Sequence, residues 1–268
     1  MGLRLDPNLN SLGAQRQVAQ STNRQIRGLQ ALASGQRINR AADDAAGLAI
    51  AEALRSDVRQ LDAESANLQT GINVAETADA ALSVQQEGLG RLQELAVQAG
   101  NGTLTDDQRA AINGEAQQIL QQIGEVAENT EFNGQQLLNT NTQVPIGTED
   151  GQQITINEST PNALGINGLD LSTQGGAESA LSALQTAQDQ VSENRSSLGA
   201  QSNGFQSAIT QRENASQNSQ EAESRIRDLD VARASILQAR NQAQTQLSVF
   251  AVAQGRIVPE TAARLLGG

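Results

Sequence analysis

The chain has 268 residues, of which 37% are hydrophobic and only 1% aromatic. It contains no His or Cys, and all 18 of its basic residues are arginine. This composition excludes imidazole and thiol chemistry, the usual zinc ligands and Ser–Lys nucleophiles. We therefore expect neither enzymatic activity nor a cofactor. The net charge of −12 argues against nucleic acid as a partner, and no apolar stretch reaches the roughly 18 residues that membrane insertion requires.

The first predicted helix runs from the N-terminal region to Ser34 and Gly35, where glycine interrupts the pattern. Its apolar residues recur at steps of three, four or seven, which is typical of a coiled-coil helix. They are Leu5, Leu9, Leu12, Ala19, Ile26, Leu29 and Ala33. Because this seam has few large side chains, it is poorly stable alone and needs neighbours.

A second, much longer helix is predicted to begin between Arg40 and Asp44 and to reach Gly100, because no proline interrupts it. At 1.5 Å per residue, about 56 residues make a helix about 84 Å long. One apolar seam repeats every seven residues, with a companion row beside it. The seam is Leu54, Leu61, Leu68, Ala75, Leu82, Leu89 and Ala96, and the companion row is Ala51, Val58 and Ile72.

The sequence AGNGTLTDDQ breaks the second helix and starts a third. Thr105 and Gln108 have the spacing of a capping box, in which each side chain bonds the other residue's backbone N–H. After this helix, the segment 132–173 is rich in Gly and Asn. Within it, Asp150-Gly151 separates QVPIG from QQITIN, which predicts a β-hairpin.

Helical spacing returns in the last third of the chain, weakens around Arg212 and Ser219, and continues to the C-terminus. Its apolar residues are Leu184, Val191, Leu198, Phe205, Ala222, Ile226, Leu229, Ile236, Ala243, Phe250 and Ile257. The predicted fold class is therefore mainly α, a long antiparallel coiled coil or helical bundle from both chain ends, with a small β-hairpin region in the middle. Seams left open at both ends favour burial in copies of the chain, and an asymmetric contact that does not close makes a filament.

Several blocks of this sequence closely resemble bacterial flagellin, the subunit of the flagellar filament. The N-terminal blocks are SLGAQRQVAQ and ALASGQRINRAADDAAGLAIAEALRSDVRQL. Further blocks, in the family's order, are GINVAETADAAL, RLQELAVQAGNGTLTDDQR and EFNGQQLLN. The C-terminal part, IRDLDVARASILQARNQAQTQLSVFAVAQGRIVPETAARLL, is similar to the family's terminal region, more loosely than the N-terminal part.

The resemblance implies a two-part subunit. Residues 1–42 and 228–268 would form a terminal coiled coil that lines the filament core, and residues 43–227 a helical shell domain with a hairpin near 132–173. The variable outer domains of larger flagellins are absent. Implied partners are further copies of the chain, the flagellar cap, the hook–filament junction proteins and an export chaperone at the C-terminal region. The implied location is a secreted, extracellular filament used for swimming, reached by type III export.

The stretch SGQRINRAADDAAGLAI is predicted to build structure. Adjacent residues on a helix point about 100° apart, so Asp43 and Asp44 are expected to interact with a helix dipole or form salt bridges, and not to act as an acid–base or metal pair. Arg37 and Arg40 offer bidentate donors, and the resemblance implies contacts between subunits. The predicted junction and interface residues are Ser34, Gly35, Arg37, Arg40, Asp43 and Asp44. The predicted terminal seam is Leu5, Leu9, Leu12, Ile26, Leu29, Ile236, Leu247 and Phe250.

In flagellins, a segment resembling RLQELAVQ, with a glutamate on the following helix, is recognised by the vertebrate innate-immune flagellin receptor. Arg91, Leu95 and Glu115 match this pattern, so the resemblance implies a receptor contact there. The chain departs from the family at Gln93, where an arginine is common. The ordinary role of these residues is filament packing.

Three alternatives to a filament subunit follow from the same features. A hook–filament junction protein has similar ends, but that family usually places proline after the acidic pair, where this chain has Ala45. A secreted coiled-coil adhesin that does not polymerise is disfavoured by the order of the motifs. The metalloprotease found in a few flagellins needs a His-Glu-x-x-His site, which a chain without histidine cannot form.

Overall fold

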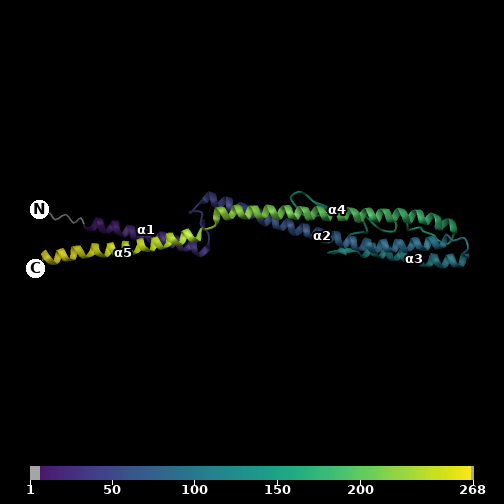
Figure 1. The fold of residues 1–268 in the computed structure, drawn as a ribbon, viewed down its shortest axis with the longest axis horizontal. Coiled ribbons are helices and arrows are strands. Elements are labelled where there is room, and N and C mark those ends of the chain that lie inside the picture. Colours follow the sequence, from purple (N-terminus) through teal and green to yellow (C-terminus); the bar gives the residue numbers. More distant parts are fainter. Residues whose placement is uncertain (1–6, 267–268) are drawn as a thin grey trace. The chain divides into compact units, whose positions relative to one another are not determined.

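The computed structural model describes residues 7–266, with side chains described for residues 12, 13, 15–250, 252 and 253. The described residues form five helices and four short strands (Figure 1). The elements are α1 (Pro7–Ser34), α2 (Ala45–Ala99), α3 (Asp106–Asn129), β1 (Glu131–Phe132), β2 (Gln135–Gln136), β3 (Thr142–Pro145), β4 (Gln153–Ile156), α4 (Gln174–Arg227) and α5 (Val231–Leu266). The chain divides into a terminal unit, residues 1–58 with 217–268, and a middle unit, residues 59–216.

The core of the middle unit lies between α2, α3 and α4, which run side by side (Figure 1). The long second helix is confirmed, since α2 continues for 55 residues. The seven-residue repeats correctly identified the faces that α2 and α4 bury. The buried members of these seams are Leu68, Ala75, Leu82, Leu89 and Ala96 on α2, and Leu184, Val191, Leu198 and Phe205 on α4.

The predicted capping box opens α3. The Thr105 hydroxyl accepts from Gln108 N at 3.3 Å, and Gln108 Oε1 accepts from Thr105 N at 2.9 Å. Two backbone donors that the first helical turn leaves unpaired are therefore satisfied. Asp106 and Asp107 add negative charge to the same turn, where the helix dipole favours it.

Removing this cap gives a first testable prediction. Thr105→Ala is expected to lower the free energy of unfolding of the middle unit by about 1 kcal/mol, because the Gln108 N–H loses its acceptor. Thermal or urea unfolding followed by circular dichroism measures the change. Thr77→Ala, which removes an exposed threonine hydroxyl from the middle of α2, is the control and should change stability by less than half as much. Equal effects of the two variants would contradict the role of the cap.

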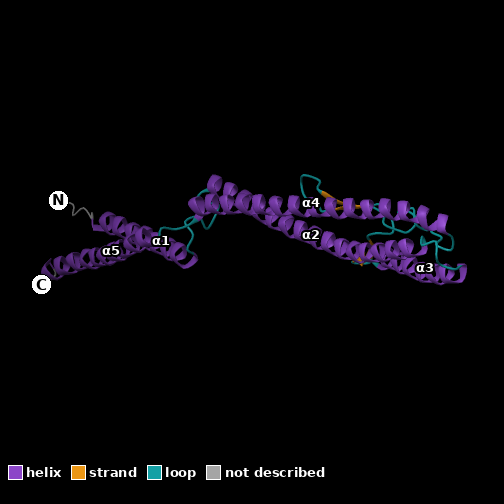
Figure 2. Ribbon diagram, turned by 45° about the vertical axis from the view of Figure 1, so that its right-hand side comes forward, coloured by secondary structure: helices purple, strands orange, loops and turns teal. Residues whose placement is uncertain are grey.

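The predicted β-hairpin is confirmed as β3 and β4. The two strands pair antiparallel, with Thr142 opposite Ile156 and Pro145 opposite Gln153. Gly151 has a φ of +65°, which the turn requires and which glycine adopts at little cost. Ile154 and Ile156 point into the core. Figure 2 shows how small this strand content is beside the helices.

A second, shorter strand pair was not predicted. It joins β1 and β2, which hold two residues each. Asn133 and Gly134 form the turn between them, and both have positive φ. Pairs of only two residues carry too little alternation for a sequence pattern to reveal them.

The two chain ends pair in the terminal unit, as predicted. Leu229 N donates to Gly35 O at 2.9 Å, and Arg37 N donates to Arg227 O at 2.7 Å. Gly28 of α1 faces Gln238 of α5, so the two helices run antiparallel and approach closely. A Cβ at position 28 would lie only 2.4 Å from Gln238 Oε1.

Candidate functional site

The first candidate surface is a set of large apolar side chains on α1 and α5. Their exposed fractions lie between 46 and 70%, although side chains of this kind are usually buried. They are Leu12, Ile26 and Leu29 on α1 and Val231, Ile236, Leu237, Leu247, Val249 and Phe250 on α5. Several exposed large apolar side chains on one pair of helices indicate a site of association with another molecule.

This surface includes the described members of the predicted terminal seam. They do not close against each other within one chain, because the α1–α5 contact leaves them between 46 and 70% exposed. Among the side chains of α1 and α5 that the structure describes, the buried ones are the polar Ser21 and Gln238. Leu5 lies outside the described residues, and of Leu9 only the helical backbone is described.

The loop between α1 and α2 is held by hydrogen bonds from its own side chains. Asp43 Oδ2 accepts from Arg40 N at 3.0 Å and from Asn39 N at 3.2 Å. Asp44 Oδ1 accepts from Gly47 N at 2.9 Å, which makes Asp44 the cap of α2. The two aspartates thus bond different backbone groups, and they do not converge on a common point.

Ser34 and Gly35 end α1, and the loop then reaches α4. Gly35 has a φ of +69°, the left-handed conformation that commonly ends a helix. The Ser34 hydroxyl accepts from Gln36 N at 3.2 Å. The Arg37 guanidinium donates to the carbonyl of Ile226, one of the last carbonyls of α4. The Arg40 guanidinium instead bonds Gln30 Oε1 at 3.1 Å, so the two arginines have different partners.

A buried ion pair that the sequence analysis missed lies in the middle unit. Arg212 Nε lies 2.7 Å from Glu64 Oε2, and the two side chains are only 8% and 9% exposed. Arg212 Nη2 also contacts Asp150 Oδ2 at 3.0 Å, while Glu64 Oε1 accepts from Glu149 N at 3.3 Å. Together these bonds connect the tip of the β3–β4 hairpin to α2 and α4. The hydrogen bond from Arg212 lowers the pKa of the Glu64 carboxyl from its usual value.

This lowered pKa predicts an acid-dependent loss of stability. The carboxylate form of Glu64 stabilises the folded state above pH 4.5, its ordinary pKa, and this contribution is lost as the pH falls through the lower folded value. Glu64→Gln is therefore expected to cost about 2 kcal/mol at pH 6 and progressively less below pH 4. Unfolding by urea, measured from pH 6 to pH 3, tests this. The exposed Glu213→Gln is the control, and a cost of Glu64→Gln that does not change with pH would contradict the prediction.

The residues predicted to contact the receptor lie on α2 and α3. Arg91 Nη2 pairs with Glu115 Oε1 at 2.8 Å, and Arg91 Nη1 pairs with Glu94 Oε2 at the same distance. All three side chains are about half exposed or more, so this ion pair network is accessible. Leu95, by contrast, is 2% exposed and belongs to the core. The side chain of Gln93 accepts from Gln188 Nε2 of α4 at 3.2 Å.

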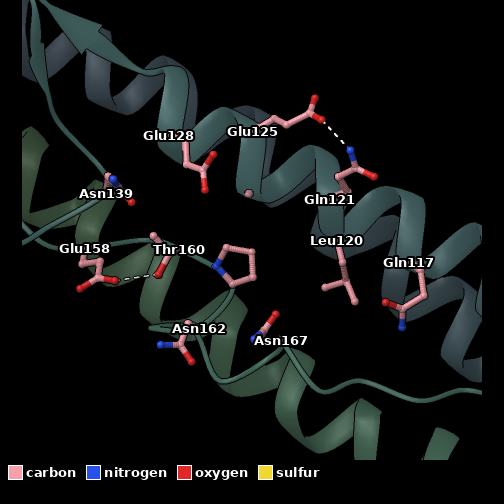
Figure 3. Close-up of a pocket in the computed structure, with 12 residues that line it drawn as sticks. Gln117, Leu120, Gln121, Glu125, Glu128, Asn139, Glu158, Thr160, Asn162 and Asn167 are labelled. Carbon is pink, nitrogen blue, oxygen red and sulfur yellow. Dashed lines mark hydrogen bonds between the residues drawn. The ribbon is translucent and has the colours of Figure 1, made fainter.

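A cavity of about 810 Å³ lies between α3 and the segment 158–167 (Figure 3). Carboxamides and carboxylates line most of it, and they bond their neighbours: Glu125 accepts from Gln121 Nε2 at 2.9 Å, and Glu158 accepts from the Thr160 hydroxyl at 2.7 Å. Among the described residues, no cluster of potential ligands is arranged to hold a metal ion, and none of the helices could cross a membrane.

Comparison with known proteins finds two matching family models. The model described as the bacterial flagellin N-terminal helical region matches residues 6–143, and the model described as the bacterial flagellin C-terminal helical region matches residues 181–266. A flagellin from Halalkalibacterium halodurans is 37% identical, over 98% of this chain and 99% of its own length. A flagellin from Bacillus subtilis is 33% identical, over 98% of this chain and all of its own length.

A solved structure is also similar. That of a flagellar hook-associated protein from Vibrio parahaemolyticus covers 69% of this chain and 99% of its own, with a TM-score of 0.61. Its sequence is 13% identical, so this likeness concerns the fold alone.

Proposed function

Because this chain belongs to the bacterial flagellin family, we propose that the exposed apolar side chains of α1 and α5 are the surface through which it polymerises into the flagellar filament. The chain is a structural protein and not an enzyme. The observation that carries the proposal is the number of large apolar side chains that the α1–α5 pair leaves exposed, with Ile236, Leu247 and Phe250 each at least 63% exposed. Burial of apolar area contributes about 25 cal/mol per Å², so copies that cover these side chains gain stability.

Residues 1–42 and 228–268 are the proposed core-lining part, and residues 43–227 the proposed shell part. The two compact units support a division of this kind, although their limits, after Val58 and before Gln217, fall further inside α2 and α4. Arg37, Arg40, Asp43 and Asp44 lie on the loop that joins α1 to α2, which supports a junction role for this loop. The guanidinium groups of arginines on such a loop are suited to bind carboxylates of neighbouring subunits.

Family membership also supports a location and a set of partners. We place the filament outside the cell, with the chain secreted through type III export and held beforehand by a chaperone at its C-terminal region. The flagellar cap and the hook–filament junction proteins are the proposed partners at the two ends of the filament.

For the innate-immune receptor, Arg91 and Glu115 are the proposed contacts, because both are accessible on the free chain and joined to each other. The buried Leu95 would contribute indirectly, because its packing in the core holds α2 in place. Arg91→Ala should then reduce binding of the isolated receptor ectodomain to free subunits. An unchanged affinity would remove this contact from the proposal.

The main test is electron microscopy of the purified chain after a polymerising salt and filament seeds are added. Long uniform tubes are expected from the full chain, and none from a version that lacks residues 1–40 and 229–268. Monomers that persist with seeds present would favour the hook–filament junction protein or the adhesin. The greater identity to flagellins, 37% against 13% for the hook-associated protein, supports the filament subunit.

A further inference from the structure

A cavity of about 480 Å³ in the terminal unit is lined by three arginines. Arg27 comes from α1, and Arg37 and Arg40 come from the loop between α1 and α2. The only carboxylate among the lining residues is Asp43. We call this cavity the arginine pocket. Its volume is that of a binding site for a side chain or a small molecule.

Within the part of the chain that the structure describes, the guanidinium groups of the arginine pocket pair with no carboxylate. The Arg40 group bonds the neutral Gln30 Oε1, and the Arg37 group bonds a backbone carbonyl. Among the described residues, Arg27 makes no hydrogen bond or ion pair. Asp43 directs Oδ2 at two backbone amides and not at an arginine. The pocket therefore has a surplus of positive charge and unused donors.

This arrangement differs from that of the arginines in the middle unit. Arg91, Arg109, Arg195 and Arg212 each pair with at least one carboxylate of their own unit, at distances from 2.7 to 3.5 Å. The chain has 30 acidic residues for 18 arginines, so carboxylates are in excess over their possible arginine partners. Three arginines around one cavity without such a partner indicate a site whose carboxylate comes from elsewhere.

The charge of the chain is also divided unevenly between its two units. The middle unit holds 5 arginines and 20 acidic residues, a formal charge of −15, whereas the terminal unit holds 13 arginines and 10 acidic residues, a formal charge of +3. Two middle units repel each other, while a terminal unit attracts the middle unit of another copy. A second copy thus supplies the carboxylates that the arginine pocket lacks.

We propose that the arginine pocket receives a carboxylate side chain from residues 59–216 of a second copy of this chain. The inference rests on the proposed function, because it names a contact within the assembled filament. The contact joins two different surfaces of identical subunits, so it is heterologous and propagates without closing. The planar guanidinium fork suits it, since it binds a carboxylate through two parallel hydrogen bonds.

The composition of the chain makes a direct test available. A carbodiimide joins a primary amine to a carboxylate only where the two are in contact, and this chain has no lysine, so its N-terminus is its only native primary amine. Arg40→Lys places one amine in the arginine pocket and keeps the charge. Filaments are assembled from an equal mixture of ¹⁵N-labelled and unlabelled copies of this variant, treated with carbodiimide, and analysed by mass spectrometry.

The expected result is a cross-link of mixed isotope composition between position 40 and a carboxylate of residues 59–216, which identifies the partner. The matched variant Arg24→Lys, on the same helix as Arg27 but outside the pocket, should not give that cross-link. Cross-links only within one chain, or no cross-links in well-formed filaments, would overturn the proposal. If the unaltered chain forms no filaments at all, the proposed function fails instead.

A second measurement uses the critical concentration for assembly at low ionic strength, where charge pairs are least screened. Arg27→Gln with Arg40→Gln is expected to raise it about tenfold or more. The control is Arg24→Gln with Arg240→Gln, at two exposed arginines outside the pocket. This double variant changes the net charge equally and should raise the critical concentration much less. Equal shifts for both pairs would show that only total charge matters, and would overturn the proposal.

Discussion

Replacing Arg212 with methionine is expected to lower the free energy of unfolding of the middle unit by about 3 kcal/mol. The substitution leaves the Glu64 carboxylate buried, with a side chain only 9% exposed, and without its positive partner. It also releases Asp150 at the tip of the β3–β4 hairpin. Urea unfolding of the monomeric full chain at pH 7, followed by circular dichroism, measures the loss.

Two further variants separate this ion pair from general effects of substitution. Glu64→Leu combined with Arg212→Met removes both buried charges and is expected to recover most of the loss, because apolar side chains of similar size replace a buried pair at little cost. Arg225→Met breaks an exposed pair with Glu221, 3.8 Å long, and should cost less than about 0.5 kcal/mol. A loss below about 1 kcal/mol for Arg212→Met would contradict the prediction.

The seven-residue repeats explain why much of this fold could be predicted from the sequence. Leu82 and Leu198 belong to such repeats and lie fully in the core, because a side chain repeated every seven residues stays on one face of a helix. The hairpin turn at Gly151 and the cap at Thr105 were also predictable, since both depend on residues within a few positions of each other.

Contacts between distant residues could not be predicted in the same way. Arg212 occupies the seam position seven residues after Phe205, so the repeat itself indicated that this side chain is buried. The charged residue at this position was instead interpreted as a point where the helical spacing weakens. Its partner Glu64 is 148 positions away, and no local pattern connects the two. Arg27 was missed for the same reason, because folding alone brings it beside Arg37 and Arg40.

Leu95 shows a limit of predicting exposed contact residues from a family motif. It was selected by its match to a family motif, whereas its spacing of three from Leu92 and four from Ala99 is that of a buried helix face. The helical pattern was therefore the better guide to burial. The exposed seam on α1 and α5 is a case in which the spacing was a good guide, because a thin seam at each chain end indicated apolar contact that a single chain does not complete.

The largest effect on assembly is expected from an aspartate in this exposed seam. Ile26→Asp and Leu247→Asp should each raise the critical concentration for assembly by more than about 100-fold, because a charge buried in an apolar interface costs several kcal/mol and each 1.4 kcal/mol is a factor of ten. Ile26 and Leu247 are 47% and 69% exposed in the single chain, so the helices of the monomer should remain folded. Sedimentation of filaments and circular dichroism of the monomer measure the two effects.

Matched controls decide whether the apolar contact or the added charge is responsible. Gln20→Asp adds the same charge to an exposed position of α1, and it should raise the critical concentration far less than Ile26→Asp. Ile26→Val keeps the site apolar and removes one methylene group, so it should assemble almost normally. If Ile26→Asp and Leu247→Asp both form filaments like those of the unaltered chain, then α1 and α5 do not carry the assembly surface. Loss of assembly together with loss of helix would instead show that these side chains stabilise the single chain, which their exposure argues against.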